Sequence, residues 1–146
     1  MKPLNELKIQ LESRSVNESY ARVAVAAFVS QLDPTVEEIN DIKTAVSEAV
    51  TNCIVHAYSD TCGRIYINVR IFENGQIIVK IRDRGCGIED IKKAREPLFT
   101  TLGGDRAGLG FSVMESFSDK ISVKSKIGVG TTVTLYKTII GRAASL

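Results

Sequence analysis

The sequence predicts an α/β protein, a two-layer sandwich in which helices pack on one face of a mixed, mostly antiparallel sheet. Segments with strand periodicity lie near both ends of the chain, two segments with helical periodicity follow the first of them, and a hairpin signal lies in the middle. Helices grouped between runs of strands are typical of a layered domain with one helical face. With 146 residues, the chain is expected to form a single domain, residues 1–146.

The composition excludes several classes of protein. Hydrophobic residues make up 44% and charged residues 25% of the chain, as in an ordinary globular protein. The formal net charge of +2 is too small to indicate direct binding of nucleic acid, and no apolar run approaches the roughly 20 residues of a membrane span. The 3 cysteines match no disulfide or zinc pattern. We therefore expect a cytoplasmic protein with reduced thiols and no membrane contact.

The first strand and the first helix are marked by periodicity and by a capping pattern. Residues 7–11 alternate apolar and polar side chains, which indicates a strand with one buried face. Ser15 followed by Glu18 is the pattern of a capping box at the start of a helix. The helical stripe that follows should end at Asp33-Pro34.

The second helix should be longer. Thr35 and Glu38 repeat the capping pattern, and the apolar stripe continues to about Tyr58. The remaining regular elements are a hairpin of residues 64–72 and 77–81 around an Asn-Gly turn, a helix at 109–117, and strands at 120–127 and 131–139.

Residues 83–110 form a glycine-rich stretch in which only a short helix, at 88–95, is expected. A loop of this length inside a small domain is usually functional. Asp83 ends a strand and is followed by Gly85 and Gly87, so a planar ligand can approach the backbone while the carboxylate accepts a hydrogen bond from an exocyclic amine.

A second glycine pair, Gly108 and Gly110, opens the helix that follows. Unpaired N–H groups and the helix dipole at such a position favour phosphate. Arg106 can add a bidentate contact to a terminal phosphate. Each glycine motif alone is better explained by simple turns, because short glycine patterns are common.

Three polar residues of the second helix, Glu48, Asn52 and His56, are spaced four apart and so share one face. This row either faces solvent or lines a cleft beneath the glycine loop. His56, the single histidine of the chain, is better explained as a structural hydrogen-bonding residue than as a metal ligand.

The motifs together resemble the Bergerat-fold ATPases, the superfamily of DNA gyrase B, Hsp90, histidine kinases and MutL. The resemblance lies in four boxes that occur in the family's order: Glu48 to Asn52, Asp83-x-Gly85-x-Gly87, Gly108-x-Gly110 and Gly130-Thr131-Thr132. It implies the Bergerat ATP-binding fold, with ATP or ADP and Mg²⁺ as cofactors. No GxxxxGK[ST] motif occurs, so the phosphates would be held by a helix N-terminus, Mg²⁺ and Arg106.

Longer stretches are similar to the small anti-sigma-factor serine kinases, namely residues 48–52, 56–58, 97–101, 108–111 and 114–115. Residues 19–23 and 28–35 are similar to the members of that family from endospore-forming bacteria. The resemblance implies a homodimer that binds a sigma factor to block transcription. It also implies that the protein uses ATP to phosphorylate a serine of an anti-anti-sigma protein.

The resemblance also assigns roles to single residues. It implies Glu48 as general base and Asn52 as ligand of Mg²⁺. The other implied contacts to the nucleotide are Asp83 at the adenine amine, Gly85 and Gly87 clearing space for the base, Thr131 at the adenine end, Gly108 and Gly110 at the phosphates, Arg106 at the γ-phosphate, and Thr100 and Thr101 at the start of the lid. The lid itself, residues 102–107, is short and glycine-rich for the family.

Other functions stay open at this point. ATP binding could switch the affinity for a protein partner without any phosphate transfer. The chain could equally be an anti-sigma kinase for a different sigma factor, one of stress response. The catalytic half of a histidine kinase is less favoured, because no helical hairpin with a phosphoacceptor histidine precedes the ATP-binding motifs.

Overall fold

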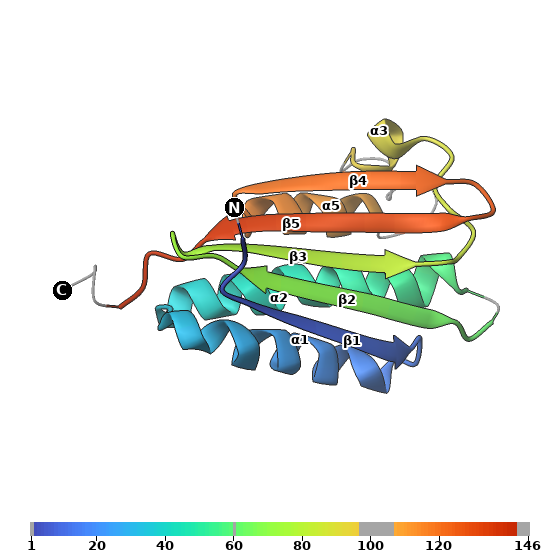
Figure 1. Ribbon diagram of the computed structural model, residues 1–146. Helices are drawn as coiled ribbons and strands as arrows, with labels where there is room; N and C mark the ends of the chain where they lie inside the picture. Colours follow the sequence, from blue (N-terminus) through green and yellow to red (C-terminus); the bar gives the residue numbers. More distant parts are fainter. Residues whose placement is uncertain (1, 60, 97–106, 143–146) are drawn as a thin grey trace.

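The structure, a computed structural model, describes residues 2–59, 61–96 and 107–142. Its sheet has five strands in the order β1-β2-β3-β5-β4 (Figure 1). The strands are β1 (Asn5–Glu12), β2 (Arg64–Ile71), β3 (Gln76–Asp83), β4 (Lys120–Lys126) and β5 (Gly130–Thr138). All pairings between these strands are antiparallel, so the predicted sandwich is confirmed with an antiparallel rather than a mixed sheet.

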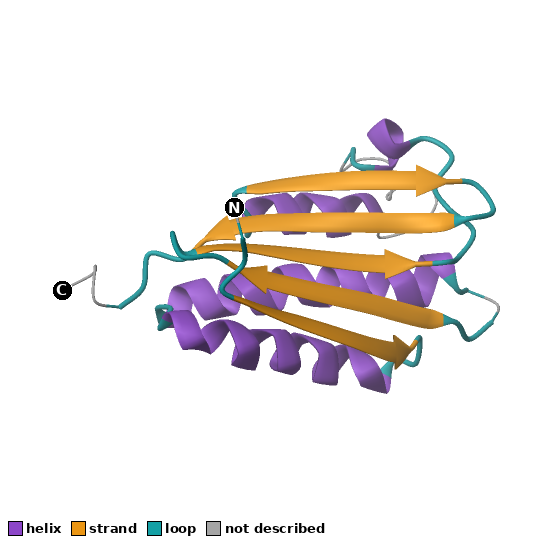
Figure 2. Cartoon of the chain, viewed as in Figure 1, coloured by secondary structure: helices purple, strands orange, loops and turns teal. Residues whose placement is uncertain are grey.

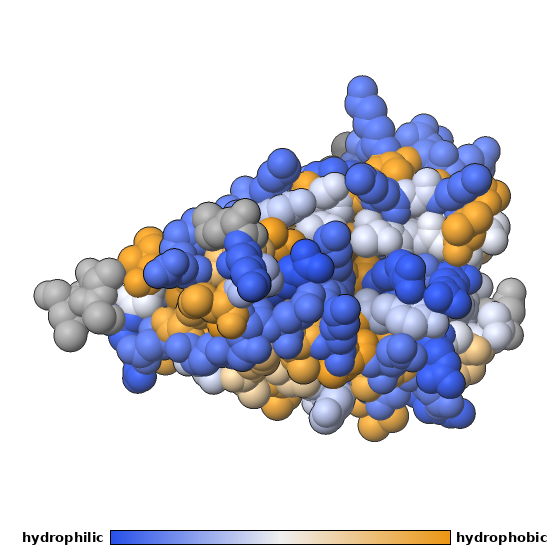
Figure 3. All heavy atoms as spheres, in the orientation of Figure 1, coloured by the Kyte–Doolittle hydropathy of each residue, from blue (hydrophilic) through white to orange (hydrophobic). Residues whose placement is uncertain are grey.

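The helices form a second layer on one face of this sheet (Figure 2). They are α1 (Val16–Val29), α2 (Val36–Asn52), α3 (Ile91–Ala94) and α5 (Ala107–Ser116), with a short 3₁₀ turn, η1 (Ser30–Leu32), after α1. Helix α2 is central and packs against both α1 and α5. The opposite face of the sheet is turned to solvent, and hydrophilic side chains cover much of it (Figure 3).

The core lies between the two layers. Alternate residues of β2 and β3 are buried, and they meet the apolar stripe of α2. The largest fully buried side chains include Ile65, Ile67, Ile81, Val46 and Val50. The buried side chains of the strands and the apolar stripe of α2 therefore pack against each other, as the sequence predicts.

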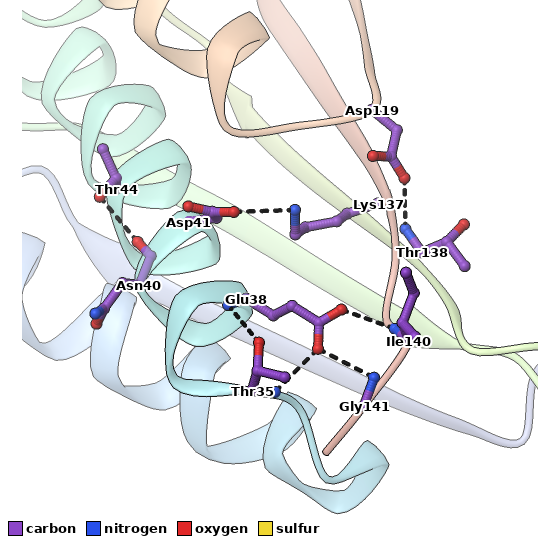
Figure 4. Close-up of polar contacts among 10 residues, drawn as sticks. All are labelled: Thr35, Glu38, Asn40, Asp41, Thr44, Asp119, Lys137, Thr138, Ile140 and Gly141. Carbon is purple, nitrogen blue, oxygen red and sulfur yellow. Dashed lines mark hydrogen bonds and ion pairs between the residues drawn. The ribbon is translucent and has the colours of Figure 1, made fainter. Parts of the chain in front are cut away.

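The capping box predicted at the start of α2 is confirmed. Thr35 Oγ1 accepts from the N–H of Glu38 at 3.1 Å, and Glu38 Oε1 accepts from the N–H of Thr35 at 2.9 Å. The same carboxylate accepts from the N–H groups of Ile140 and Gly141 at 2.7 and 3.1 Å (Figure 4). Glu38 thus joins the start of α2 to the segment that follows β5.

The capping box predicted at Ser15 is wrong. Ser15 precedes α1 with helical backbone angles and makes no side-chain cap hydrogen bond. Its expected partner, Glu18, instead accepts from Arg22 Nε at 3.2 Å and from the hydroxyl of Ser47 on α2. A contact between the two helices therefore replaces the local cap.

Helix α2 does not continue as an α-helix to Tyr58. It ends at Asn52 and passes into a π-helical turn, η2 (Cys53–Ala57), closed by the N–H of Tyr58 on the carbonyl of Cys53 at 3.1 Å. Single π turns are frequent at functional sites. This turn lies at the end of the sheet where β3 finishes, whereas both described chain ends lie toward the opposite end (Figure 1).

None of the helices in the described residues has the length and apolar character needed to cross a membrane.

Candidate functional site

A cavity of about 930 Å³ opens at the end of the sheet where β3 finishes. Its walls come from α2 and η2, from the segment after β3 that includes α3, from Phe111 on α5, and from β4 and β5. Among the residues that the structure describes, four predicted site residues line it: Asn52, Asp83, Gly87 and Thr131. The volume lies within the range of small-molecule and cofactor sites.

Asp83, the last residue of β3, is held rigidly at the wall of this cavity. Its Oδ1 accepts from the N–H of Gly85 at 2.9 Å and from the N–H of Thr131 at 3.1 Å. The side chain is buried, with 6% of its surface exposed. Both backbone donors bond to Oδ1, which leaves Oδ2 with capacity to accept from a ligand.

Burial also changes the acidity of Asp83. Removal from water raises the pKa of this carboxyl above its ordinary value of 3.8, and the N–H donors of Gly85 and Thr131 partly offset the rise. Cys53, buried beside it, has a thiol whose pKa burial and the neighbouring Asp83 raise well above 9.0. The Cys53 thiol is therefore neutral at neutral pH.

Ser125 on β4 is a cavity residue that the sequence analysis missed. It lies opposite Thr131 in the register, and the two hydroxyl oxygens are 2.7 Å apart. Ser125 Oγ also accepts from the N–H of Ile88 at 2.7 Å and so attaches the segment after β3 to the hairpin. The sequence offered one sign of this role, a polar residue on the inward side of a strand. That sign can be recognised only when the register of the strands is known.

Gly85 packs against η2. It does not line the cavity, and a Cβ at this position would lie 2.3 Å from the carbonyl oxygen of Ala57. Glycine is needed there because the loop packs against η2. Gly87 does line the cavity, with a φ of +81 that side chains rarely adopt.

Hydrogen bonds join the π turn and Tyr58 after it to the loop that follows β3. The N–H of Cys86 donates to the carbonyl of Ala57 at 3.2 Å, and the N–H of Arg84 donates to the hydroxyl of Tyr58 at 2.6 Å. That hydroxyl donates in turn to the carbonyl of Arg64 at 2.8 Å. Tyr58 therefore fixes the backbone on both sides of the cavity wall next to Asp83.

At the other end of the site, Glu48 and Asn52 lie together beneath α5. A Cβ at Gly110 would lie 3.2 Å from both Glu48 Oε2 and Asn52 Oδ1, so glycine permits this close approach. Asn52 Nδ2 is buried and has no hydrogen-bond partner among the residues that the structure describes. Glu48 itself borders a neighbouring open groove between α1 and α2 rather than the main cavity.

The remaining predicted contacts are only partly placed. Gly108 lies in the first turn of α5, as expected. Thr100, Thr101 and Arg106 lie outside the described residues. His56 lines the cavity from η2. Within the described ranges there is no group of three or more His, Cys, Asp or Glu side chains placed to hold a metal. A metal ion in this cavity would therefore depend on Asn52 and on the phosphate oxygens of a bound nucleotide.

The family is decided by comparison of the whole chain with known proteins. Residues 10–137 match the model of the histidine kinase-like ATPase domain. The chain is 55% identical over 139 residues to an anti-sigma F factor of Caldanaerobacter subterraneus subsp. tengcongensis, which covers 94% of this chain and 96% of that protein. The chain belongs to the histidine kinase-like ATPase family.

Further proteins are similar to this chain in sequence or in fold. An anti-sigma F factor of Geobacillus kaustophilus is 53% identical over 137 residues, 92% of this chain and 93% of that protein. The RsbU and RsbW domains of Rv1364c from Mycobacterium tuberculosis have a TM-score of 0.69 at 20% identity, over 94% of this chain and 33% of that one. A blue-light activated histidine kinase domain of Erythrobacter litoralis has a TM-score of 0.58 at 22% identity, over 84% of this chain and 60% of that one. The two structures show a common fold, and the histidine kinase-like ATPase domain implies that the chain binds a nucleotide.

Proposed function

We propose that this protein is an anti-sigma factor that binds and inhibits sigma F, a sporulation sigma factor, and phosphorylates a serine of its anti-anti-sigma antagonist with Mg-ATP. Identity above 50% to two anti-sigma F factors over almost the whole chain supports the sigma factor partner. The observation that carries the kinase activity is one cavity with the buried acceptor Asp83 and the amide of Asn52 in its wall, and with the Glu48 carboxylate beside that amide at the Gly110 backbone.

The adenine base would bind at the Asp83 end. Oδ1 is occupied by the backbone donors of Gly85 and Thr131, so Oδ2 is the atom left to accept from an exocyclic amine. A carboxylate accepts but does not donate, so it favours adenine, which has an amine at this position, over guanine, which has a carbonyl oxygen. Thr131 and Ser125 would flank the same end of the nucleotide.

The phosphates would lie toward α5. The glycines at 108 and 110 leave the start of this helix open to anions, whose charge the dipole favours. Rotation of the Asn52 amide exchanges its nitrogen and oxygen, so the buried group without a described partner can present oxygen to Mg²⁺. Bound there, Mg²⁺ would neutralise charge on the phosphates. Gly108, Thr100, Thr101 and Arg106 complete the proposed phosphate contacts.

Glu48 is the proposed general base. Its Oε2 lies beside the Gly110 backbone, at the edge of the groove between α1 and α2, through which a protein substrate can approach. In the transfer, the serine oxygen forms a bond to the γ-phosphorus and its proton passes to the Glu48 carboxylate. The bond between the γ-phosphorus and the bridging oxygen breaks, and ADP leaves with that electron pair.

The deciding experiment mixes the purified protein with γ-labelled ATP, Mg²⁺ and a purified anti-anti-sigma protein. We expect acid-stable label on a serine of the antagonist. Acid-labile label would indicate phosphohistidine and contradict serine specificity. Nucleotide binding without any label on the antagonist would favour the alternative of a nucleotide-switched binding module.

We also propose that the protein acts in the cytoplasm as a homodimer, as the resemblance to anti-sigma-factor kinases implies, without contact to nucleic acid or membrane. A parallel binding assay with sigma F and a stress-response sigma factor separates the two possible partners. Binding to the stress factor alone would overturn the sporulation assignment and leave the kinase assignment standing.

A further inference from the structure

The face of the sheet opposite the helices is uncovered. Odd-numbered residues of β3, β4 and β5, such as Ile81, Ile121 and Val133, are buried in the core. Because successive side chains of a strand point to opposite faces, the even-numbered residues of these three strands point away from the helices. Figure 3 shows this face, with hydrophilic side chains spread over much of it.

The outward positions of these three strands carry positive charge only. β3 contributes Lys80 and Arg82, and β4 contributes three lysines, at 120, 124 and 126. The outward residues of β5 are neutral, with a partly exposed hydroxyl group at Thr132. No aspartate or glutamate occupies an outward position on β3, β4 or β5 in the described chain. We call this surface, the outward side of β3, β5 and β4, the basic face.

The charge of the basic face is not neutralised within the part of the chain that the structure describes. None of its lysines or arginines forms an ion pair there. The other half of the same sheet differs, because Glu6 on β1 accepts from Arg70 at 2.7 Å and from Asn68 at 2.9 Å. Since the whole chain has a net charge of only +2, positive charge is concentrated on one surface.

The spacing of the cations matches an extended acidic chain. Arg82 lies opposite Thr132, which lies opposite Lys124, so two strand spacings, about 10 Å, separate the two cations across the sheet. Along β4, Lys124 and Lys126 are about 7 Å apart, the distance between alternate residues of an extended peptide. Thr132, between the rows, offers a hydroxyl that can donate or accept.

Two other occupants fit less well. The guanidinium groups of Arg82 and Arg84 lie 4.6 and 4.9 Å from the ring centre of Tyr66, so this ring is covered by cations and is not open for stacking on a nucleic-acid base. A second copy of this chain would bring positive charge against positive charge, which is unfavourable. A polypeptide segment with carboxylates carries the opposite charge and needs no open aromatic ring on which to stack.

We propose that the basic face docks an acidic, extended segment of a partner protein. This surface lies on the opposite side of the sheet from the nucleotide cavity, so the inference goes beyond the proposed kinase site. The binding depends on Lys80, Arg82, Lys124 and Lys126, and it weakens with salt because exposed charges are screened.

The test uses a fluorescein-labelled peptide of about twelve residues with alternating glutamate and serine, followed by anisotropy at low salt. We expect Lys80→Glu/Lys124→Glu to weaken binding about tenfold or more. The matched control, Lys43→Glu/Lys92→Glu on α2 and α3, makes the same change in net charge and should alter binding less than about twofold. Lys80→Gln/Lys124→Gln, which introduces no repulsion, should show an intermediate loss and serves if the first variant folds poorly.

Three results would overturn the proposal. Equal losses in the test and control variants would mean that overall charge and not this face attracts the peptide. Tighter binding of an oligothymidylate of equal charge, lost in the same variants, would make the face a nucleic-acid surface. Loss of self-association in Lys80→Glu/Lys124→Glu, with the peptide still bound, would make it an interface between copies of the chain.

Discussion

The backbone N–H of Thr131 donates to Oδ1 of Asp83 across 3.1 Å, although 48 residues separate them in the sequence. This bond ties the end of β3 to the start of β5 and orients the carboxylate at the cavity wall. The acceptor proposed for adenine is therefore part of the sheet and not of a loose loop. Several predictions about binding depend on this rigidity.

Asp83→Asn should abolish recognition of adenine without unfolding the protein. The amide oxygen can still accept from Gly85 and Thr131, whereas the amide nitrogen replaces Oδ2 and opposes the amine of the base. Loss of one charge-assisted bond costs about 1.5–3 kcal/mol, so ATP affinity should fall about 10- to 150-fold. Calorimetric titration measures this. Glu73→Gln, in the exposed turn after β2, is the control, and equal affinity in Asp83→Asn would contradict the assignment.

Nucleotide binding should depend on pH through the same residue. Because burial raises the pKa of Asp83 above 3.8, its carboxylate takes up a proton at a higher pH than an ordinary aspartate does. Protonation converts the acceptor to a donor, so ADP affinity should fall as the pH is lowered through that raised value. The dissociation constant is measured from about pH 7 to about pH 4 in wild type and in Asp83→Asn. The phosphates titrate in both proteins, so identical profiles would show that Asp83 makes no contribution.

Glu48→Gln should separate binding from catalysis. The amide keeps the size of the side chain but cannot take the serine proton, so transfer should slow about 10²- to 10⁴-fold. ATP affinity should stay within a few fold, because Glu48 borders the groove between α1 and α2 and not the main cavity. Single-turnover transfer and equilibrium binding are measured on the same preparation. An unchanged transfer rate would remove Glu48 from the role of base.

Gly85→Ala should damage the site from outside the cavity. The added Cβ would lie 2.3 Å from the carbonyl oxygen of Ala57, so the loop must move away from η2. Overpacking of this kind costs about 1–3 kcal/mol, and we expect both a lower thermal midpoint and weaker ATP binding. Gly128→Ala is the comparison, since φ is +76 there but no atom lies within 4 Å of the added Cβ. If Gly85→Ala binds ATP as tightly as Gly128→Ala, the packing against η2 does not support the site.

Glu38→Gln should make the fold less stable in a pH-dependent way. Burial alone would raise the pKa of Glu38, but the N–H donors of Thr35, Ile140 and Gly141 outweigh this and lower it. A lowered folded-state pKa gives stability that is complete above the unfolded value and is lost as the pH falls through the folded one. The variant should lose about 1–2 kcal/mol near pH 7 and less near pH 3. Denaturant unfolding measures this, with the exposed neighbour variant Glu37→Gln as control; a difference that does not shrink in acid would be inconsistent with ionised Glu38.

The sequence predicted those features that depend on local patterns. The alternation of residues 7–11 lies within β1, and the Thr35 and Glu38 pair forms its capping box because both partners belong to the same helical turn. The same pattern failed at Ser15, because Glu18 bonds to Arg22 and to Ser47 on another helix. A local pattern cannot weigh such a distant competitor.

The site was predicted in its residues more than in its geometry. Asp83, Asn52, Gly87 and Thr131 line the cavity as expected. The change from α to π helix after Asn52 was not predicted, because the five residues of η2 are too few to distinguish a π-helical from an α-helical pattern. The packing of Gly85 against η2 was not predicted for a related reason, since its neighbour Ala57 belongs to that turn.

Both described chain ends lie toward one end of the sheet, and the cavity lies at the other (Figure 1). A fusion next to residue 2 or residue 142 would consequently lie at the end of the sheet away from the cavity. Such a fusion can be a fluorescent reporter, an affinity tag or a surface anchor. Biosensor measurements on immobilised protein should then leave the entrance for ATP accessible.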